Sequence, residues 1–374
     1  MQTANLEPKR HFEILDGLRG VAAISVVVMH LLAPFSYDFD YLQYFNHGYL
    51  AVDFFFLLSG FVIGHAYDDR WNRMSVGDFF LRRLIRLHPM IIVGTLLGAI
   101  GFYFGASPNV FPLIGQTPVW KLILVMLIGF TLLPVGKSLD IRGWGEMHPL
   151  NGPQWSLLYE YIANILYAFW IRKWKQRTLV LFVVIAAIAV FYLALTSKTN
   201  DLNGGWSLTP VHLQFGFIRL IFPFFAGLLL VRVQKPTKIN NAFFWSSLLL
   251  VVLFAFPRIQ LAGFGLANGL FEAVAVVFIF PAIVYIGANG VVKRALPAKI
   301  CRFLGVISYP LYITHYPLVY VFNVWVIDHR ISIGKGWPVA LLCLLIALAI
   351  AHVSLKIYDE PLRKRLTAWQ KGRK

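Results

Sequence analysis

The chain has 374 residues, of which 58% are apolar and 14% are charged, and its formal net charge is +17. Soluble domains carry about 25% charged residues, so this composition excludes an ordinary soluble protein. Runs of roughly 20 apolar residues, long enough to cross ~30 Å of hydrocarbon, recur from end to end. The sequence therefore predicts one all-α transmembrane bundle over residues 1–374, with no separate soluble domain.

The excess of positive charge has a common cause in membrane proteins, because their cytoplasmic loops accumulate Lys and Arg. The excess of Lys and Arg therefore indicates how the chain is oriented in the membrane, and no nucleic-acid partner is predicted. The two cysteines, Cys301 and Cys343, form neither a disulfide framework nor a metal-ligand spacing, so no metal is predicted.

Eleven apolar runs are candidate crossings: 14–35, 48–67, 88–106, 119–135, 153–171, 178–196, 216–232, 242–256, 270–288, 303–326 and 338–357. Most basic residues lie in six segments: the two termini, 68–88, 172–177, 232–238 and 293–302. All six face the cytoplasm if run 119–135 does not cross. The sequence thus predicts about ten crossings with both termini cytoplasmic, and a re-entrant or interfacial segment near 119–135.

The first predicted helix carries two ionisable residues, Arg19 and His30. Eleven residues at about 100° each place them on one face, ~16 Å apart along the axis. An ionisable residue inside a membrane helix is costly and indicates function by default. Arg19 is expected toward the cytoplasm and His30 near mid-membrane or beyond. The alternative is that both only hydrogen-bond neighbouring helices.

The second predicted helix contains Asp53 near its outer end and Ser59 beside Gly60. Asp53 is a candidate partner for His30 or for a substrate hydroxyl. Ser59 fits close packing better than catalysis, because small residues at helix contacts usually serve packing.

The first cytoplasmic loop continues as FLRRLIRLHP and contains Arg82, Arg83 and Arg86. A guanidinium donates several hydrogen bonds from one planar fork, which suits phosphates. The three residues are therefore a candidate phosphate clamp on the cytoplasmic side. The alternative is an orientation signal with snorkelling to lipid phosphates.

The next crossing helix reads PQWSLLYEYIANILYAFW and carries a polar stripe along one face. The stripe consists of Ser156, Glu160, Asn164 and Tyr167. It is expected to face the bundle interior or a water-filled path. Glu160, its only acid, is a candidate partner for Arg19 or for a histidine, and a purely structural carboxylate is the alternative. Trp155, at the start of this helix, is a candidate for substrate contact or a structural role.

Late in the chain, FLGVISYPLYITHYPLV contains Ser308, Tyr309 and His315. Ser308 and His315 are seven residues apart and share a helix face. A lone helical histidine more often satisfies a hydrogen bond than it catalyses, so His315 ranks below His30. All three are candidates for substrate contact or a structural polar role.

Six segments also occur together, and in this order, in a known family. They are DGLRGVAAISVVVMH, VDFFFLLSGFVI, RRLIR, QWSLLYE, ISYPLYITHYP and DEPLRKR, spanning residues 14–365. Together they resemble the acyltransferase-3 family of bacterial membrane O-acyltransferases. The resemblance implies acyl-CoA, often acetyl-CoA, as cytoplasmic co-substrate, and a sugar or other hydroxyl compound as acceptor. It also implies a bacterial inner membrane and a role in activity for Arg19, His30, Arg83 and Arg86.

The expected mechanism places the CoA phosphates on the three arginines of the first loop, with Arg19 at the inner mouth. The pantetheine arm then extends between helices toward His30. His30 either deprotonates the acceptor hydroxyl or accepts the acyl group itself, and Asp53 or Glu160 orients the ring or the acceptor. Many relatives carry an extra periplasmic domain, so this chain is expected to act alone or with a periplasmic partner.

Two other classes of function remain open from the sequence. A secondary transporter also needs intramembrane ionisable residues, and it should show inverted repeats and flux without CoA. A membrane sensor or scaffold would tolerate the loss of His30. Neither explains the arginine cluster together with the Arg19/His30 helix.

Overall fold

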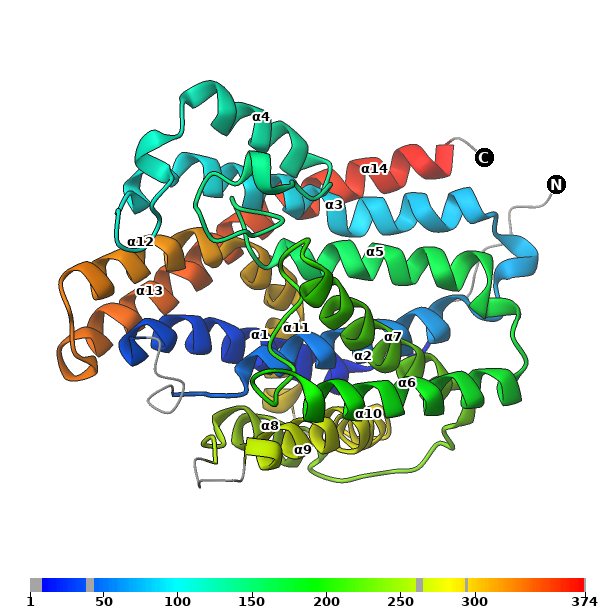
Figure 1. Cartoon of the computed structure of the whole chain (residues 1–374). Helices are drawn as coiled ribbons and strands as arrows, with labels where there is room; N and C mark the ends of the chain where they lie inside the picture. The colour runs from blue at the N-terminus through cyan, green and yellow to red at the C-terminus, as the bar shows by residue number, and fades with distance from the viewer. Residues whose placement is uncertain (1–8, 38–43, 260–264, 293–294, 373–374) are drawn as a thin grey trace.

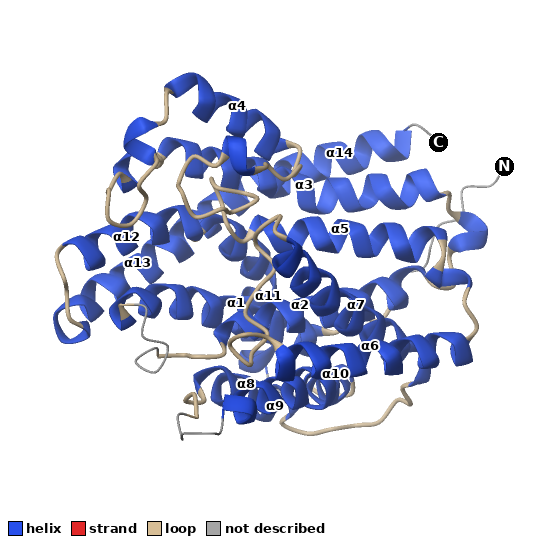
Figure 2. Ribbon diagram, in the orientation of Figure 1, coloured by secondary structure: helices blue, strands red, loops and turns tan. Residues whose placement is uncertain are grey.

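The computed structural model describes residues 9–37, 44–259, 265–292 and 295–372, and this part of the chain is helical with no β-strand (Figures 1 and 2). The prediction of an all-α protein is therefore confirmed for these residues. The first seven helices are α1 (Glu13–Leu32), α2 (Ala51–Tyr67), α3 (Val76–Ile100), α4 (Val119–Phe130), α5 (Gln154–Phe169), α6 (Gln176–Thr196) and α7 (Pro210–Val233). The others are α8 (Ala242–Ala255), α9 (Gly265–Val274), α10 (Phe280–Ala288), α11 (Ala295–Thr314), α12 (Tyr316–Asp328), α13 (Ile333–Ser354) and α14 (Glu360–Gly372). Four of the predicted cytoplasmic cations lie outside the described residues: Lys293, Arg294, Arg373 and Lys374.

Seven helical segments of the described chain are long and apolar enough to span a membrane. They are Glu13–Ser36, Gly48–Tyr67, Val76–Ile100, Gln176–Thr196, Pro210–Val233, Leu266–Ala288 and Ile333–Gly372. These spans support an integral membrane protein. The ten predicted crossings additionally require α5, α8 and the α11–α12 pair, which are shorter or more polar, and that number stays a prediction.

The segment predicted to be re-entrant or interfacial forms a helix of only 12 residues, α4. At 1.5 Å per residue it is roughly 18 Å long, too short to cross ~30 Å of hydrocarbon. Its last turn lies against α3, where the hydroxyl of Thr95 donates to the carbonyl of Gly129 at 3.5 Å. Trp120 and Leu127 on α4 are exposed, and α4 lies at the edge of the bundle in Figure 1. Its depth in the membrane stays a prediction.

Small residues set the closest helix contacts. On α2, a Cβ at Gly60 would lie 1.8 Å from the carbonyl oxygen of Phe224 on α7. On α7, a Cβ at Gly227 would lie 2.1 Å from the carbonyl oxygen of Leu57 on α2. Both positions require glycine because the two backbones touch there, as is common between membrane helices.

The predicted crossing at 303–326 is interrupted at His315, between α11 and α12. Pro317 has no N–H and leaves the carbonyl four residues earlier, that of Ile313, without its helical donor. The side chain of Asn151 supplies the missing bond, since its Nδ2 donates to this carbonyl at 2.8 Å. The break therefore fixes the segment that precedes α5 against the middle of the bundle.

Candidate functional site

A cavity of about 890 Å³ is enclosed by α1, α2, α3, α5, α11 and α14. Its volume is typical of a ligand site. Two of its wall residues lie on α11 and are ten positions apart, Arg302 and Tyr312, so the cavity extends roughly 15 Å along that helix. Eight of the lining side chains are Lys or Arg: Arg10, Arg19, Arg83, Arg86, Arg302, Arg363, Lys364 and Lys371. Only four are acidic, so the cavity favours an anionic ligand.

Glu160 joins two predicted site residues in the wall of this cavity. Its Oε1 accepts hydrogen bonds from Arg83 at 2.5 Å and from the hydroxyl of Ser59 at 2.6 Å. The side chains of Arg83 and Glu160 are 6% and 16% exposed. The expectation that Glu160 pairs with Arg19 or a histidine is therefore wrong, and its partner is Arg83.

The three arginines of the predicted clamp differ in their surroundings. Arg83 is engaged by Glu160, whereas Arg86 lines the cavity and makes no hydrogen bond or ion pair to any described residue. Arg82 is not among the residues that line the cavity. The structure thus leaves Arg86 as the guanidinium that is free to bind an anion.

Arg19 is held in place by α11 and by its own helix. Its Nε donates to the hydroxyl of Ser308 at 2.8 Å, and its Nη2 donates to the carbonyl of Gly305 at 3.1 Å. Asp16 lies 3.2 Å from the same Nη2 atom. Arg19 and Ser308 both line the cavity, and the sequence did not predict their contact.

The C-terminal helix contributes wall residues that the sequence analysis missed. A π-helical turn, Leu355–Asp359, precedes α14 and carries the buried Asp359. Its carboxylate accepts from Arg363 at 3.0 Å, and both side chains line the cavity. The DEPLRKR motif was the available signal, but in the sequence it contributed only to the family resemblance.

The end of the cavity at Tyr312, opposite the end at Arg302, carries hydroxyl groups. Ser156 and Tyr312 line it, and their oxygens are 2.8 Å apart. Tyr309 lines the same cavity and donates to the carbonyl of Leu87 at 2.5 Å. The sequence had singled out Ser156 and Tyr309, whereas Tyr312 had no separate signal.

His30 lies just beyond this end and does not line the cavity. Its ring stacks on His315 at 5.5 Å between centroids, and the ring of His315 is 6.2 Å from that of Tyr312. The Nδ1 atom of His315 donates to the carbonyls of Leu311 and Tyr312, at 3.0 and 2.9 Å. The expected route from the arginines to His30 thus ends one layer of side chains short of the imidazole.

Asp53 lies outside the cavity, in a buried ion pair with Arg219. Arg219 Nη2 lies 2.5 Å from Asp53 Oδ2, and its Nη1 donates to the carbonyl of Gly204 at 2.7 Å. Trp155 packs over the same guanidinium, with its ring centroid 5.4 Å away. The expectation that Asp53 pairs with His30 or a substrate hydroxyl is wrong, because the carboxylate of Asp53 forms an ion pair with Arg219. The isolated Arg219 in an apolar run was the signal that could have found this pair.

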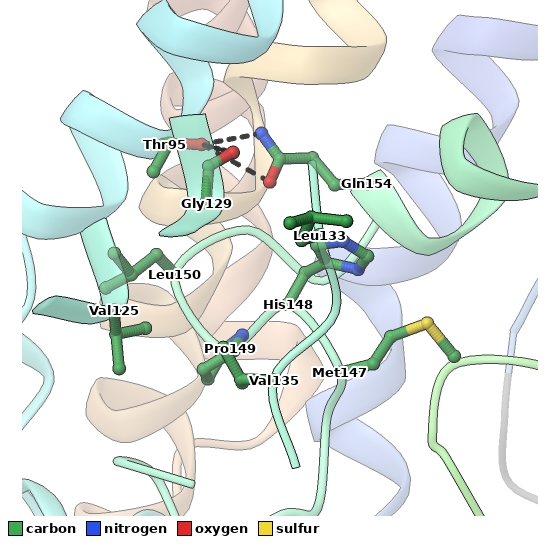
Figure 3. Close-up of a pocket in the computed structure, with 10 residues that line it drawn as sticks. All are labelled: Thr95, Val125, Gly129, Leu133, Val135, Met147, His148, Pro149, Leu150 and Gln154. Carbon is green, nitrogen blue, oxygen red and sulfur yellow. Dashed lines mark hydrogen bonds between the residues drawn. The ribbon is translucent and has the colours of Figure 1, made fainter. Parts of the chain in front are cut away.

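The first turn of α5 is tied to α3 by side chains that do not line the cavity (Figure 3). The amide of Gln154 donates to the hydroxyl of Thr95 at 2.8 Å and to the carbonyl of Ile91 at 3.0 Å. Next to it, His148 bonds the carbonyl of Leu132 at 3.1 Å. Burial lowers the pKa of His148 to about 4, so this imidazole is neutral at physiological pH.

No group of three His, Cys, Asp or Glu side chains within the described ranges has the spacing to hold a metal ion. A family model described as an acyltransferase domain matches residues 12–355. "Protein 2 in picA locus" of Rhizobium radiobacter is 31% identical over 193 residues, 50% of this chain and 96% of that protein. "O-acetyltransferase OatA" of Staphylococcus aureus is 23% identical over 369 residues, 95% of this chain and 58% of OatA. The chain thus spans somewhat more than half the length of OatA, and no solved structure matches it.

Proposed function

This chain belongs to the acyltransferase-3 family, and from that premise we propose that it is a membrane O-acetyltransferase that uses acetyl-CoA. The proposed acceptor is a hydroxyl of a cell-envelope glycan or another molecule on the outer side of the bacterial inner membrane. The observation that carries the proposal is the cation-rich cavity, which leads from the ends of the described chain to the hydroxyls beside His315.

The cavity suits the donor in charge and in length. The phosphates of CoA would bind among the cations of its mouth, with Arg86 as the unpaired guanidinium. The pantetheine arm would follow α11 over the roughly 15 Å from Arg302 to Tyr312. The thioester would then lie beside Ser156 and Tyr312, whose hydroxyls hydrogen-bond each other and the carbonyl of Pro153.

The reaction exchanges one acyl bond for another. The acceptor oxygen attacks the thioester carbonyl, a C–O bond forms, and the C–S bond breaks. His30 takes the hydroxyl proton and returns it to the departing thiolate, so the products are an ester and CoA thiol. The acetyl end of the donor must therefore pass the layer formed by Tyr312 and His315 to reach the imidazole. Neutral imidazole is needed for the first of these steps, and the ring of His30 packs on those of His315 and Tyr316.

The test is turnover of radiolabelled acetyl-CoA by the purified full chain in nanodiscs, with and without a cell-envelope glycan extract. Release of CoA thiol together with label in the glycan supports the proposal. If the chain neither binds CoA nor consumes thioester, the proposal fails. A flux of solute in proteoliposomes without CoA would then identify a secondary transporter.

Arg86→Ala is expected to raise the dissociation constant for CoA by at least about 10-fold, because a charge-assisted hydrogen bond contributes about 1.5–3 kcal/mol. Binding is measured by equilibrium dialysis of labelled CoA at constant salt, since screening weakens such contacts. Arg73→Ala is the matched control: Arg73 is exposed, lies just before α3 and does not line the cavity. Equal CoA binding by the Arg86 variant and the wild type would exclude Arg86 as a phosphate ligand.

A further inference from the structure

Two residues in the wall of the donor cavity, the cation-rich cavity proposed to bind acetyl-CoA, each have a buried atom that lacks a hydrogen-bond partner among the described residues. One atom is Nε of Arg83 on α3, and the other is Oδ1 of Asp359, in the π-helical turn before α14. Arg83 is 5% exposed and Asp359 is 1% exposed. A buried polar atom without a partner is costly, so each of these atoms is expected to meet its partner in the cavity.

The carboxylate of Asp359 is fixed in a way that leaves one oxygen available. Its Oδ2 accepts from Nη1 of Arg363 at 3.0 Å, whereas Oδ1 accepts from no described group. The turn that carries Asp359, Leu355–Asp359, is π-helical, and such turns inside helices are frequent at functional sites. The ion pair and the turn therefore hold a free acceptor at the cavity before any ligand binds.

The guanidinium of Arg83 is fixed in the same way and leaves a donor available. Its Nη2 is bound by Glu160, so the N–H at Nε is the group without a partner. Tyr309 on α11, which also lines the cavity, lies close enough to both Arg83 and Asp359 to interact with each of them electrostatically. One free donor and one free acceptor therefore lie in the same region of the cavity.

A secondary amide satisfies both atoms, because it carries one N–H donor and one carbonyl acceptor. A phosphate offers only acceptors and would be repelled by the carboxylate of Asp359. The pantetheine arm of acetyl-CoA contains two secondary amides, and two methylene groups separate the nearer nitrogen from the sulfur, a span of roughly 4 Å at standard bond lengths. Tyr309 precedes Tyr312 by one helical turn, about 4.5 Å along the axis. A thioester beside Tyr312 thus brings the nearer amide to the level of Tyr309.

We propose that Asp359 and Arg83 recognise the pantetheine arm of the donor through this amide. Oδ1 of Asp359 accepts from the amide N–H, and Nε of Arg83 donates to the amide carbonyl. The inference rests on the proposed acetyltransferase function and adds the residues that select a CoA thioester over other phosphorylated molecules. It makes Asp359 a residue for donor specificity, although its charge is opposite to that of most of the cavity.

The test compares three ligands on the purified full chain in nanodiscs by titration calorimetry: CoA, 4′-phosphopantetheine, and 3′,5′-ADP, which has phosphates but no arm. Asp359→Ala is expected to weaken binding of CoA and 4′-phosphopantetheine by at least about 10-fold, because a hydrogen bond to a charged group is lost. Binding of 3′,5′-ADP should be unchanged or tighter, because the variant removes a negative charge from a cavity that favours anions.

Glu360→Ala is the matched control for charge. Glu360 follows Asp359 directly, lines the same cavity and pairs with Lys356 at 2.7 Å, and its side chain is 33% exposed. The control removes the same charge as Asp359→Ala but no buried acceptor that lacks a partner. It should therefore not weaken the binding of 4′-phosphopantetheine.

Two conservative variants separate the hydrogen bonds from folding. Asp359→Asn keeps an oxygen that can accept, so it should lose less affinity for 4′-phosphopantetheine than Asp359→Ala and keep a thermal midpoint close to the wild type. Arg83→Lys keeps a positive charge beside Glu160 but has no Nε. It should weaken the binding of 4′-phosphopantetheine more than that of 3′,5′-ADP.

The inference is overturned if Asp359→Ala binds 4′-phosphopantetheine as tightly as the wild type does. It also fails if this variant loses 3′,5′-ADP to the same extent, because the carboxylate would then only shape the phosphate site. A wild type that binds CoA no more tightly than 3′,5′-ADP would refute recognition of the arm and leave the proposed function standing. A wild type that binds neither CoA nor 4′-phosphopantetheine and consumes no thioester would refute the proposed function itself.

Discussion

His30→Ala should lower acetyl transfer by about 100-fold or more, because positioned proton transfer contributes typically 10²–10⁴ to a rate. In the proposed mechanism no other group takes the proton of the acceptor hydroxyl. The loss should fall on kcat rather than on the half-saturating acetyl-CoA concentration, since His30 does not line the donor cavity. Label transfer to envelope glycan by the purified variant measures it.

The thermal midpoint of the His30 variant should stay close to that of the wild type, because His30 makes no hydrogen bond to any described residue. His352→Ala, an exposed histidine on α13, is the matched control and should retain full activity. Wild-type activity in the His30 variant would exclude the mechanism. A loss of CoA binding in that variant would instead assign His30 to the donor site.

Asp53→Ala should destabilise the folded protein by about 3–5 kcal/mol, because it leaves Arg219 as an uncompensated buried charge. Asp53 is 0% exposed and Arg219 is 1% exposed, and they join α2 to α7. The measurement is the midpoint of thermal unfolding in detergent, followed by tryptophan fluorescence. Activity should fall only in proportion to the folded fraction.

The double variant Asp53→Val with Arg219→Met should regain most of the lost stability, because replacing a whole buried ion pair with apolar side chains is often neutral. Asp69→Ala is the control: its partner is Lys9, and Asp69 is 67% exposed, so only a small effect is expected. If Asp53→Ala keeps the wild-type midpoint but loses acetyl transfer, Asp53 is a functional residue, as the sequence had suggested.

Part of the cavity wall was predictable, and for two physical reasons. A charged side chain within a membrane span is expected to face the bundle interior, which selected Arg19 and Glu160. A guanidinium suits phosphates, which selected Arg83 and Arg86, and all four residues line one cavity.

The partners within the wall were not predictable. Glu160 had several candidate cations, and it pairs with Arg83, 77 positions away. Asp53 pairs with Arg219, 166 positions away. Each choice depends on how far a helix is rotated about its axis, and packing against distant helices sets that rotation.

The sequence by itself determined that this protein is all-α, that it belongs in a membrane and which short segments carry its charges. These properties depend on hydropathy and periodicity within stretches of about 20 residues, so local sequence is sufficient. Only the tertiary structure decided that His30 lies beyond the donor cavity, packed on His315 and Tyr316, and that Glu160 pairs with Arg83. Those placements depend on how helices that are distant in the sequence pack and rotate against one another, which no local stretch of sequence determines.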